Sequence, residues 1–279
     1  MCSAISGSRG GSRTISEQTT FDFIIDDLGS SDAWDGVFTV IDCKKALSPS
    51  RLPGLNFALN PYGGCTHGCI YCYAPEVTHS EWGDWRAVRV KKNVAERLAK
   101  ELRWVDGTIG IGTVTDPYQD PERRFMLTRR CLEVISRTDV PIAILTKSDL
   151  VLRDMELIPK MRHTVNITVT TVDDRVSKRT EPGAPLPSRR LDALRTLVDA
   201  GMNTTVMVGP IMSTLQGREM ELAEAIIRTG VTRASLDRLN PRPLLSERLD
   251  RMGIGASPES VEKVKRYLSD AGIAVEDAF

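Results

Sequence analysis

The stretch that decides the fold is GGCTHGCIYCYAP, residues 63–75. It places Cys65, Cys69 and Cys72 within eight residues, while the other cysteines of the chain lie singly. Three nearby thiolates can bind zinc or an iron–sulfur cluster. A structural zinc site usually has four ligands in two pairs, and here only His67 could add a fourth. A [4Fe–4S] cluster held by three cysteines leaves one iron open, as a catalytic centre requires. From spacing alone, both centres remain possible.

Composition sets limits on the class of protein. The 279 residues suffice for one large domain or two small ones. The 37 basic and 37 acidic residues balance, which argues weakly against binding nucleic acid by electrostatics alone. No apolar run is long enough to span a membrane, and residues 1–20 lack the apolar centre of a secretory signal. We therefore expect a cytoplasmic protein without a membrane segment, whose clustered cysteines bind a metal rather than form disulfides.

Beyond the cysteine stretch, short β-branched runs alternate with amphipathic helical patterns. The strand-like runs are LNFALNPYG (55–63), TIGIGTV (108–114), VPIAILT (140–146), TVNITVTTV (164–172), NTTVMVGP (203–210) and TRASLDRL (232–239). Six alternations of this kind predict a parallel sheet, whose chemistry lies at the carboxyl ends of the strands. The cysteines follow the first run and so lie at that end. Cys131 lies on an apolar helical stripe and is predicted to be a core residue.

The run 164–172 has one apolar and one polar face. Val165, Ile167 and Val169 alternate with Asn166, Thr168 and Thr170. A parallel strand covered on both faces is ordinarily apolar on both. A polar inner face fits a barrel whose lumen holds a ligand.

CTHGCIYC (65–72) resembles the CxxxCxΦC motif of the radical S-adenosylmethionine (SAM) superfamily, with Tyr71 at the aromatic position. The wider motifs resemble its spore photoproduct lyase-like subgroup: NPYGGCTHGCIYCYAP (60–75), GTVTDPYQDPERR (112–124), LTKSDLVLRD (145–154) and RTEPGAPLPSRRLDALRTLVDAGM (179–202). Together with the alternation, this predicts a partial (β/α)6 TIM-type barrel. We expect an N-terminal tail and extension over 1–54, the core barrel over 55–240 and a C-terminal helical cap over 241–279.

The resemblance implies the cofactors and their chemistry. Cys65, Cys69 and Cys72 would hold a [4Fe–4S] cluster, and SAM would chelate its open iron. An electron, supplied by a donor such as flavodoxin or ferredoxin, would cleave SAM to a 5′-deoxyadenosyl radical that abstracts hydrogen from a substrate. Such a cluster should be oxygen-sensitive.

The resemblance also implies roles for individual residues. Tyr71 would lie near the adenine of SAM, and Tyr71 and Tyr73 match a pair that spore photoproduct lyases are thought to use in returning hydrogen. The remaining SAM contacts would come from strand ends: Thr113, Thr115, Asp116, Lys147, Thr168, Thr170 and Val208. Arg179 and Glu181 are candidates for contact with the substrate or SAM.

Three functions remain open. The favoured one is a radical SAM enzyme acting on a peptide or protein, a nucleoside or a small metabolite. The second is a DNA repair lyase like the spore photoproduct lyases. Those enzymes keep a hydrogen-donating cysteine near the end of the second strand, whereas GIGTVTDPYQD (110–120) has none. The third is a non-catalytic iron–sulfur or zinc binding module.

Overall fold

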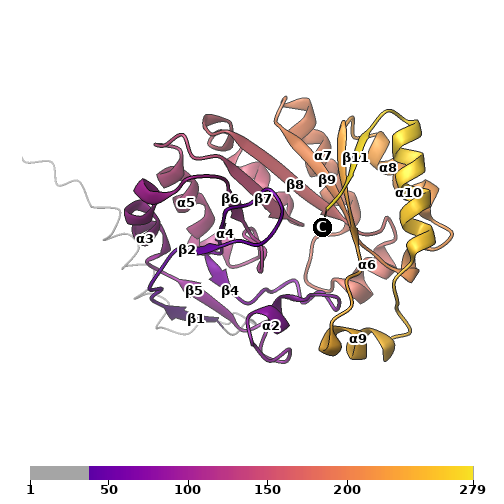
Figure 1. Ribbon diagram of the computed structural model, residues 1–279, viewed down its shortest axis with the longest axis horizontal. Coiled ribbons are helices and arrows are strands. Elements are labelled where there is room, and N and C mark those ends of the chain that lie inside the picture. The colour runs from indigo at the N-terminus through magenta and orange to yellow at the C-terminus, as the bar shows by residue number, and fades with distance from the viewer. Residues whose placement is uncertain (1–37, 279) are drawn as a thin grey trace, which may run out of the picture. The chain divides into compact units, whose positions relative to one another are not determined.

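The computed structural model describes residues 38–278. A sheet with strand order β11-β10-β9-β8-β7-β6-β3-β2 forms its centre (Figure 1). The central strands are parallel to one another: β3 (Phe57–Leu59), β6 (Ile109–Ile111), β7 (Ile142–Thr146), β8 (His163–Val169), β9 (Thr204–Ile211) and β10 (Arg233–Arg238). These are the six strands that the alternation predicts. Since β2 and β11 form the two edges of the sheet and do not pair with each other, the sheet is an open, partial TIM-type barrel.

The two edge strands extend the sheet beyond the predicted six. β2 (Leu47–Pro49) pairs antiparallel with β3, and β11 (Ala274–Asp277) pairs parallel with β10. The segment 241–279, predicted to be a helical cap, contains two helices and then adds this strand to the sheet. β11 lies at an edge and is mostly exposed, so it lacks the apolar run that marks a central strand.

A smaller sheet stands beside the first strands of the barrel. β5 (Val88–Lys91) pairs parallel with β1 (Phe38–Ile41) and antiparallel with β4 (Tyr62–Gly63). The described part of the predicted N-terminal extension therefore contributes one strand to each sheet, β1 here and β2 at the barrel edge. Residues 1–37 of that extension lie outside the described residues.

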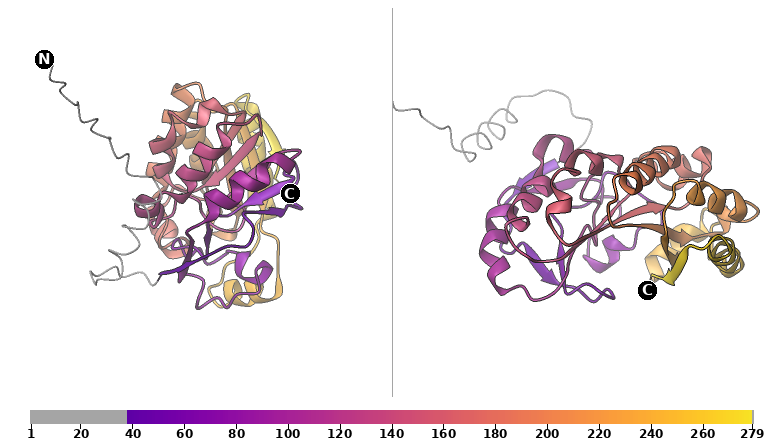
Figure 2. Two further views of the ribbon diagram at one scale, coloured as in Figure 1. Left: turned by 90° about the vertical axis from the view of Figure 1, so that its left-hand side faces the viewer. Right: turned by 90° about the horizontal axis from the view of Figure 1, so that it is seen from above.

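Helices cover the outer face of the curved sheet (Figure 2). The longer ones are α3 (Val94–Glu101), α5 (Leu127–Ile135), α7 (Pro187–Asp199), α8 (Glu219–Ile227) and α10 (Pro258–Asp270). Shorter helices are α4 (Glu122–Phe125), α6 (Asp174–Thr180) and the 3-10 turns η1 (Leu102–Trp104), η2 (Asp149–Asp154), η3 (Ile158–Lys160) and η4 (Ser213–Leu215). Cys131 on α5 has no exposed surface, which confirms its prediction as a core residue.

Two helices lie on the side of the cysteine loop instead. They are α2 (Ala74–Val77), which directly follows the loop, and α9 (Pro243–Asp250). The backbone N–H of Leu244 on α9 donates to the Glu76 carboxylate on α2 at 3.1 Å. Of the predicted C-terminal cap, α9 thus covers the loop, whereas α10 packs against α8 in the outer layer.

Candidate active site

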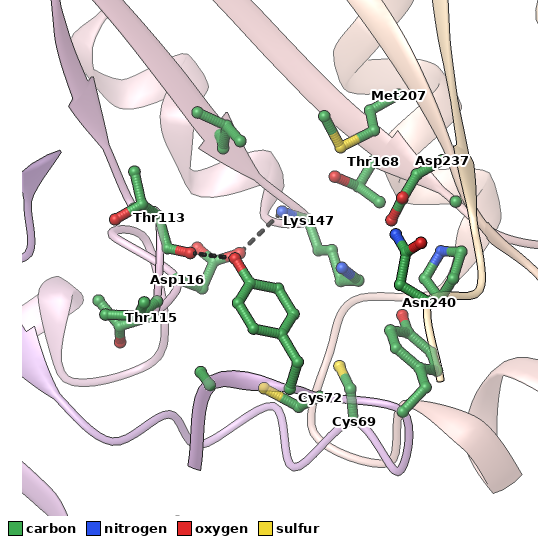
Figure 3. A pocket seen from close by; sticks show the side chains of 18 of the residues that line it. Cys69, Cys72, Thr113, Thr115, Asp116, Lys147, Thr168, Met207, Asp237 and Asn240 are labelled. Carbon is green, nitrogen blue, oxygen red and sulfur yellow. Dashed lines mark hydrogen bonds between the residues drawn. The ribbon is translucent and has the colours of Figure 1, made fainter. Parts of the chain in front are cut away.

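A cavity of about 390 Å³ lies at the carboxyl ends of the barrel strands (Figure 3). In a parallel barrel this end carries the connecting loops, so side chains from many segments converge there. The lining includes Cys65, His67, Cys69, Tyr71, Cys72, Tyr73, Thr113, Thr115, Asp116, Lys147, Thr168, Met207, Gly209, Asp237, Arg238, Asn240 and Arg242. The cysteine loop and the ends of β6 to β10 therefore enclose one space.

All three clustered cysteines line this cavity. Cys65 and Cys69 are 8% exposed, and Cys72 is half-buried. Burial raises the pKa of each thiol, that of Cys69 to about 12. Metal binding requires thiolates, so a bound centre must supply the positive charge that stabilises them. Among residues 38–278, no three His, Cys, Asp or Glu side chains are arranged to hold a single metal ion. The three cysteines that hold a [4Fe–4S] cluster each bind a separate iron, so they need not converge on one metal ion.

The first half of the cysteine loop is held by β6 and the segment after it. Gly64 has φ +83°, and a Cβ there would lie 2.6 Å from the Trp85 carbonyl oxygen. The Gly64 carbonyl accepts hydrogen bonds from Thr115 Oγ1 at 2.5 Å and from Gln119 Nε2 at 3.2 Å. Gln119 Oε1 also accepts from the Thr66 N–H at 2.8 Å. Thr115 and Gln119 therefore fix the backbone on both sides of Cys65.

The second half of the loop is held by α9. Arg248 donates from Nε to the Ile70 carbonyl at 2.5 Å and from Nη2 to the Cys72 carbonyl at 2.9 Å. Its guanidinium lies 3.6 Å from the centre of the Trp82 ring. Leu245 and Leu249 of the same helix pack in one apolar cluster with Cys69 and Tyr71. Sequence reasoning missed Arg248, because nothing local marks an arginine some 176 residues from its partner.

Tyr71 is anchored by a buried ion pair. Its hydroxyl donates to Glu181, which also accepts from Thr170 Oγ1 at 3.0 Å and pairs with Arg190 at 2.5 Å. Neither side chain of the pair is exposed. Burial raises the pKa of Glu181, but Arg190 and Lys147 outweigh it and hold that pKa at about 2. The Tyr71 ring lines the cavity, and Lys147 Nζ lies 5.5 Å from its centre.

Asp116 joins the ends of β6 and β7. Its carboxylate accepts from Thr146 Oγ1 at 2.7 Å, from the Lys147 N–H at 2.8 Å and from the Tyr118 N–H at 2.9 Å. His67 Nδ1 lies 3.5 Å away, and burial lowers the pKa of that imidazole. Asp116 lines the cavity, but donors of this chain already occupy both of its oxygens.

The remaining predicted residues divide between the cavity and its surroundings. Thr113, Thr115 and Thr168 line it, and Tyr73 lines it while donating to the Thr113 carbonyl at 2.8 Å. Four are absent from the lining: Thr170, Arg179, Glu181 and Val208. Thr170 and Glu181 lie behind Tyr71, and Arg179 is exposed on α6 and donates to the Met252 carbonyl.

Val208 is also absent from the lining, and its side chain has no exposed surface. Its neighbours Met207 and Gly209 reach the cavity instead. A contact between Val208 and SAM stays a prediction, and it would have to use the backbone.

β10 and the segment after it supply cavity residues that the sequence interpretation missed. Asp237 and Arg238 are the last two residues of the strand, and Asn240 and Arg242 follow it. The signal was present, because TRASLDRL (232–239) was predicted to be the sixth strand and Asp237 stands at its carboxyl end.

The family model for the Radical SAM superfamily matches residues 59–223. This superfamily uses a [4Fe–4S] cluster and SAM. An uncharacterised protein of Methanocaldococcus jannaschii is 35% identical over 189 residues, covering 66% of this chain and 71% of that protein. An uncharacterised protein of Mycobacterium tuberculosis is 35% identical over 201 residues, covering 65% of this chain but 58% of its own length.

Two solved structures share the fold. Spore photoproduct lyase complexed with dinucleoside spore photoproduct superposes with a TM-score of 0.70 at 14% identity, covering 98% of this chain and 87% of that one. Streptococcus suis SuiB bound to the precursor peptide SuiA has a TM-score of 0.54 at 15% identity, covering 81% and 49%. In residues 38–278 no helix is long and apolar enough to cross a membrane.

Proposed function

Because the chain belongs to the radical SAM superfamily, we propose that it is an enzyme that uses SAM to abstract hydrogen from a substrate held in the cavity. A [4Fe–4S] cluster bound by Cys65, Cys69 and Cys72 would supply the electron that cleaves SAM to a 5′-deoxyadenosyl radical. The observation that supports this most directly is that all three thiols line one cavity together with the ends of β6 to β10. The thiols fit the cluster because they leave a ligand position for SAM.

The residues of the chain would bind and orient SAM. Lys147 places a cation at the end of β7, where it can pair with the SAM carboxylate. Tyr71 offers a ring face that Glu181 holds in place. Thr113 and Thr168 offer hydroxyls from β6 and from the end of β8. Walls of this kind keep water away from a reactive intermediate.

We propose that the substrate is a peptide or protein side chain, a nucleoside or a small metabolite. SuiB, which shares the fold, has a precursor peptide bound. A DNA lyase is the alternative, and the arginines at the cavity, Arg51, Arg238 and Arg242, would suit an anionic substrate. Against it, the cysteines that line the cavity in the described chain are the three cluster ligands, which leaves no separate hydrogen-donating thiol there.

We also propose that the protein works in a reducing compartment such as the cytoplasm, with flavodoxin or ferredoxin as electron donor. The cysteines of residues 38–278 are free thiols, which fits that environment. We propose domain boundaries of 1–54, 55–240 and 241–279, with one addition to the core. α9 holds the cysteine loop, so the site needs part of the third segment.

The test is anaerobic reconstitution with iron and sulfide, followed by dithionite and SAM. We expect a reducible [4Fe–4S] signal by electron paramagnetic resonance and release of 5′-deoxyadenosine. Replacing any one of Cys65, Cys69 or Cys72 by alanine should abolish both. The matched control is Cys43→Ala, because Cys43 lies outside the cavity lining. A colourless protein that retains zinc and makes no 5′-deoxyadenosine would contradict the proposal and favour a non-catalytic zinc module.

A further inference from the structure

Asp237 presents an unsatisfied carboxylate to the cavity. Its Oδ1 is buried, and no donor within residues 38–278 makes a hydrogen bond to it. Burial raises the pKa of Asp237 to about 6, while the charge of Lys147 opposes that rise. Asp116, the other acidic residue lining the cavity, is by contrast fully bonded. Buried polar atoms are nearly always paired, so an unpaired one inside a binding cavity points to a missing ligand.

Two backbone features aim Asp237 at the cavity. β9 and β10 pair regularly up to Leu236 and Val208, and the register then shifts between Leu236 and Arg238. A shift of this kind next to a site redirects a side chain. Across the strands, Gly209 makes room, since a Cβ there would lie 2.3 Å from Asp237 Cβ. The position of this carboxylate therefore depends on the local backbone geometry of both strands.

The surroundings of Asp237 differ from those of three predicted SAM contacts, Thr113, Thr115 and Asp116. Thr113, Thr115 and Asp116 lie on one side of the cavity, and Asp237 and Asn240 lie on the other, with Lys147 and Thr168 between them (Figure 3). Met207 and Leu239 add apolar surface on the Asp237 side. A group bound there would meet one carboxylate, one amide and apolar walls.

We propose that Asp237 binds the substrate, accepting a hydrogen bond from an N–H group of an amine, amide or guanidinium that is attached to an apolar body. Asp237 would thereby select substrates that present such a donor and place them across the cavity from Thr113, Thr115 and Asp116. The inference rests on the proposed function, because it assigns the β10 side of the same cavity to the substrate.

The test uses small probes on the cluster-loaded, SAM-bound protein in its oxidised state. Ethylguanidinium and propionamide carry N–H donors, and N,N-dimethylpropionamide has a similar body without one. Dissociation constants come from ligand-observed saturation-transfer titrations. We expect both donors to bind wild type at least tenfold more tightly than Asp237→Asn, whereas the dimethyl amide should not distinguish them. The matched control Asp250→Asn, exposed on α9, should bind like wild type.

A second variant distinguishes loss of the Asp237 contact from loss of folding. Gly209→Ala keeps the carboxylate but displaces it, so it should weaken donor binding by a similar factor while circular dichroism confirms the fold. Equal donor binding by wild type and Asp237→Asn, or no donor binding by wild type, would overturn the proposal. So would a tenfold loss of SAM affinity in Asp237→Asn by equilibrium dialysis, which would assign Asp237 to SAM. Failure of the proposed function has a separate readout, the absence of 5′-deoxyadenosine.

Discussion

Replacing Glu181 by glutamine tests how the Tyr71 side of the cavity is held. The amide is nearly the same size as the carboxylate, and it can still accept hydrogen bonds from Tyr71 and Thr170. Its loss of charge leaves the Arg190 guanidinium, which is fully buried 2.5 Å from Glu181, without a counter-charge. The variant therefore measures how much the charge of the ion pair contributes to stability, because the packing around it is kept.

Two estimates of the effect agree. Removing one partner of a buried ion pair costs about 3–5 kcal/mol, because the remaining charge stays desolvated. Independently, lowering the Glu181 pKa from 4.5 to about 2 corresponds to about 3 kcal/mol. In a chain of this size each kcal/mol moves the melting temperature by about 2–4 °C. We expect Glu181→Gln to lower the melting temperature by about 6–20 °C.

The assays are thermal melting and urea unfolding of the cluster-free protein, both followed by circular dichroism. The control is Glu224→Gln on α8, whose exposed pair with Arg228 should contribute less than about 1 kcal/mol. Adding Arg190→Met to Glu181→Gln should recover part of the loss, since it removes the unpaired charge. A loss below about 1 kcal/mol in Glu181→Gln would refute the reasoning.

The same pair predicts a dependence on pH. The folded-state pKa of Glu181 lies below its unfolded value, so its stabilisation is fully present above that unfolded value, about 4.5. It is lost as the pH falls from about 5 toward 2. The difference in unfolding free energy between wild type and Glu181→Gln should therefore be constant at neutral pH and shrink on acidification. A difference that stays unchanged down to pH 3 would contradict the low pKa.

Three further predictions concern the cysteine loop and SAM. Arg248→Gln removes the charge that binds the Ile70 and Cys72 carbonyls, so we expect several-fold less iron per protein after reconstitution. Its control is Arg251→Gln, at an exposed residue directly after α9, which should bind iron like wild type. Lys147→Met should weaken SAM binding about tenfold or more by equilibrium dialysis, since a charged hydrogen bond contributes about 1.5–3 kcal/mol. The control is Lys160→Met, at an exposed position. Unchanged SAM affinity in Lys147→Met would exclude Lys147 from the SAM site. Gly64→Ala should destabilise the protein by about 1–3 kcal/mol or more in urea unfolding, because the side chain must adopt a positive φ and also meets the Trp85 carbonyl. Gly201→Ala shares the positive φ but has open space around it, so an equal loss there would show that the contact with Trp85 does not matter.

The central strands and the cysteine ligand set could be read from the sequence because their signals are local. A strand shows its period within a few residues, as Val165, Ile167 and Val169 do on β8. The CxxxCxxC spacing lies within one loop, and the motifs at the ends of β6 and β7 directly follow recognisable strands. The parallel order of the sheet brings these strand ends together, so Thr113, Asp116 and Lys147 could be placed at one cavity without coordinates.

Tertiary structure alone decided which side chains hold that cavity and which face it. Arg248 reaches Ile70 across 178 residues and Glu181 reaches Tyr71 across 110, contacts that form only when the barrel curves and its ends approach each other. The register between β9 and β10 shifts by one residue where Asp237 lines the cavity, and the alternation on β9 brings Met207 rather than Val208 to the lining. Periodicity specifies which residues share a face of one element, but contacts between distant elements depend on how the whole sheet closes.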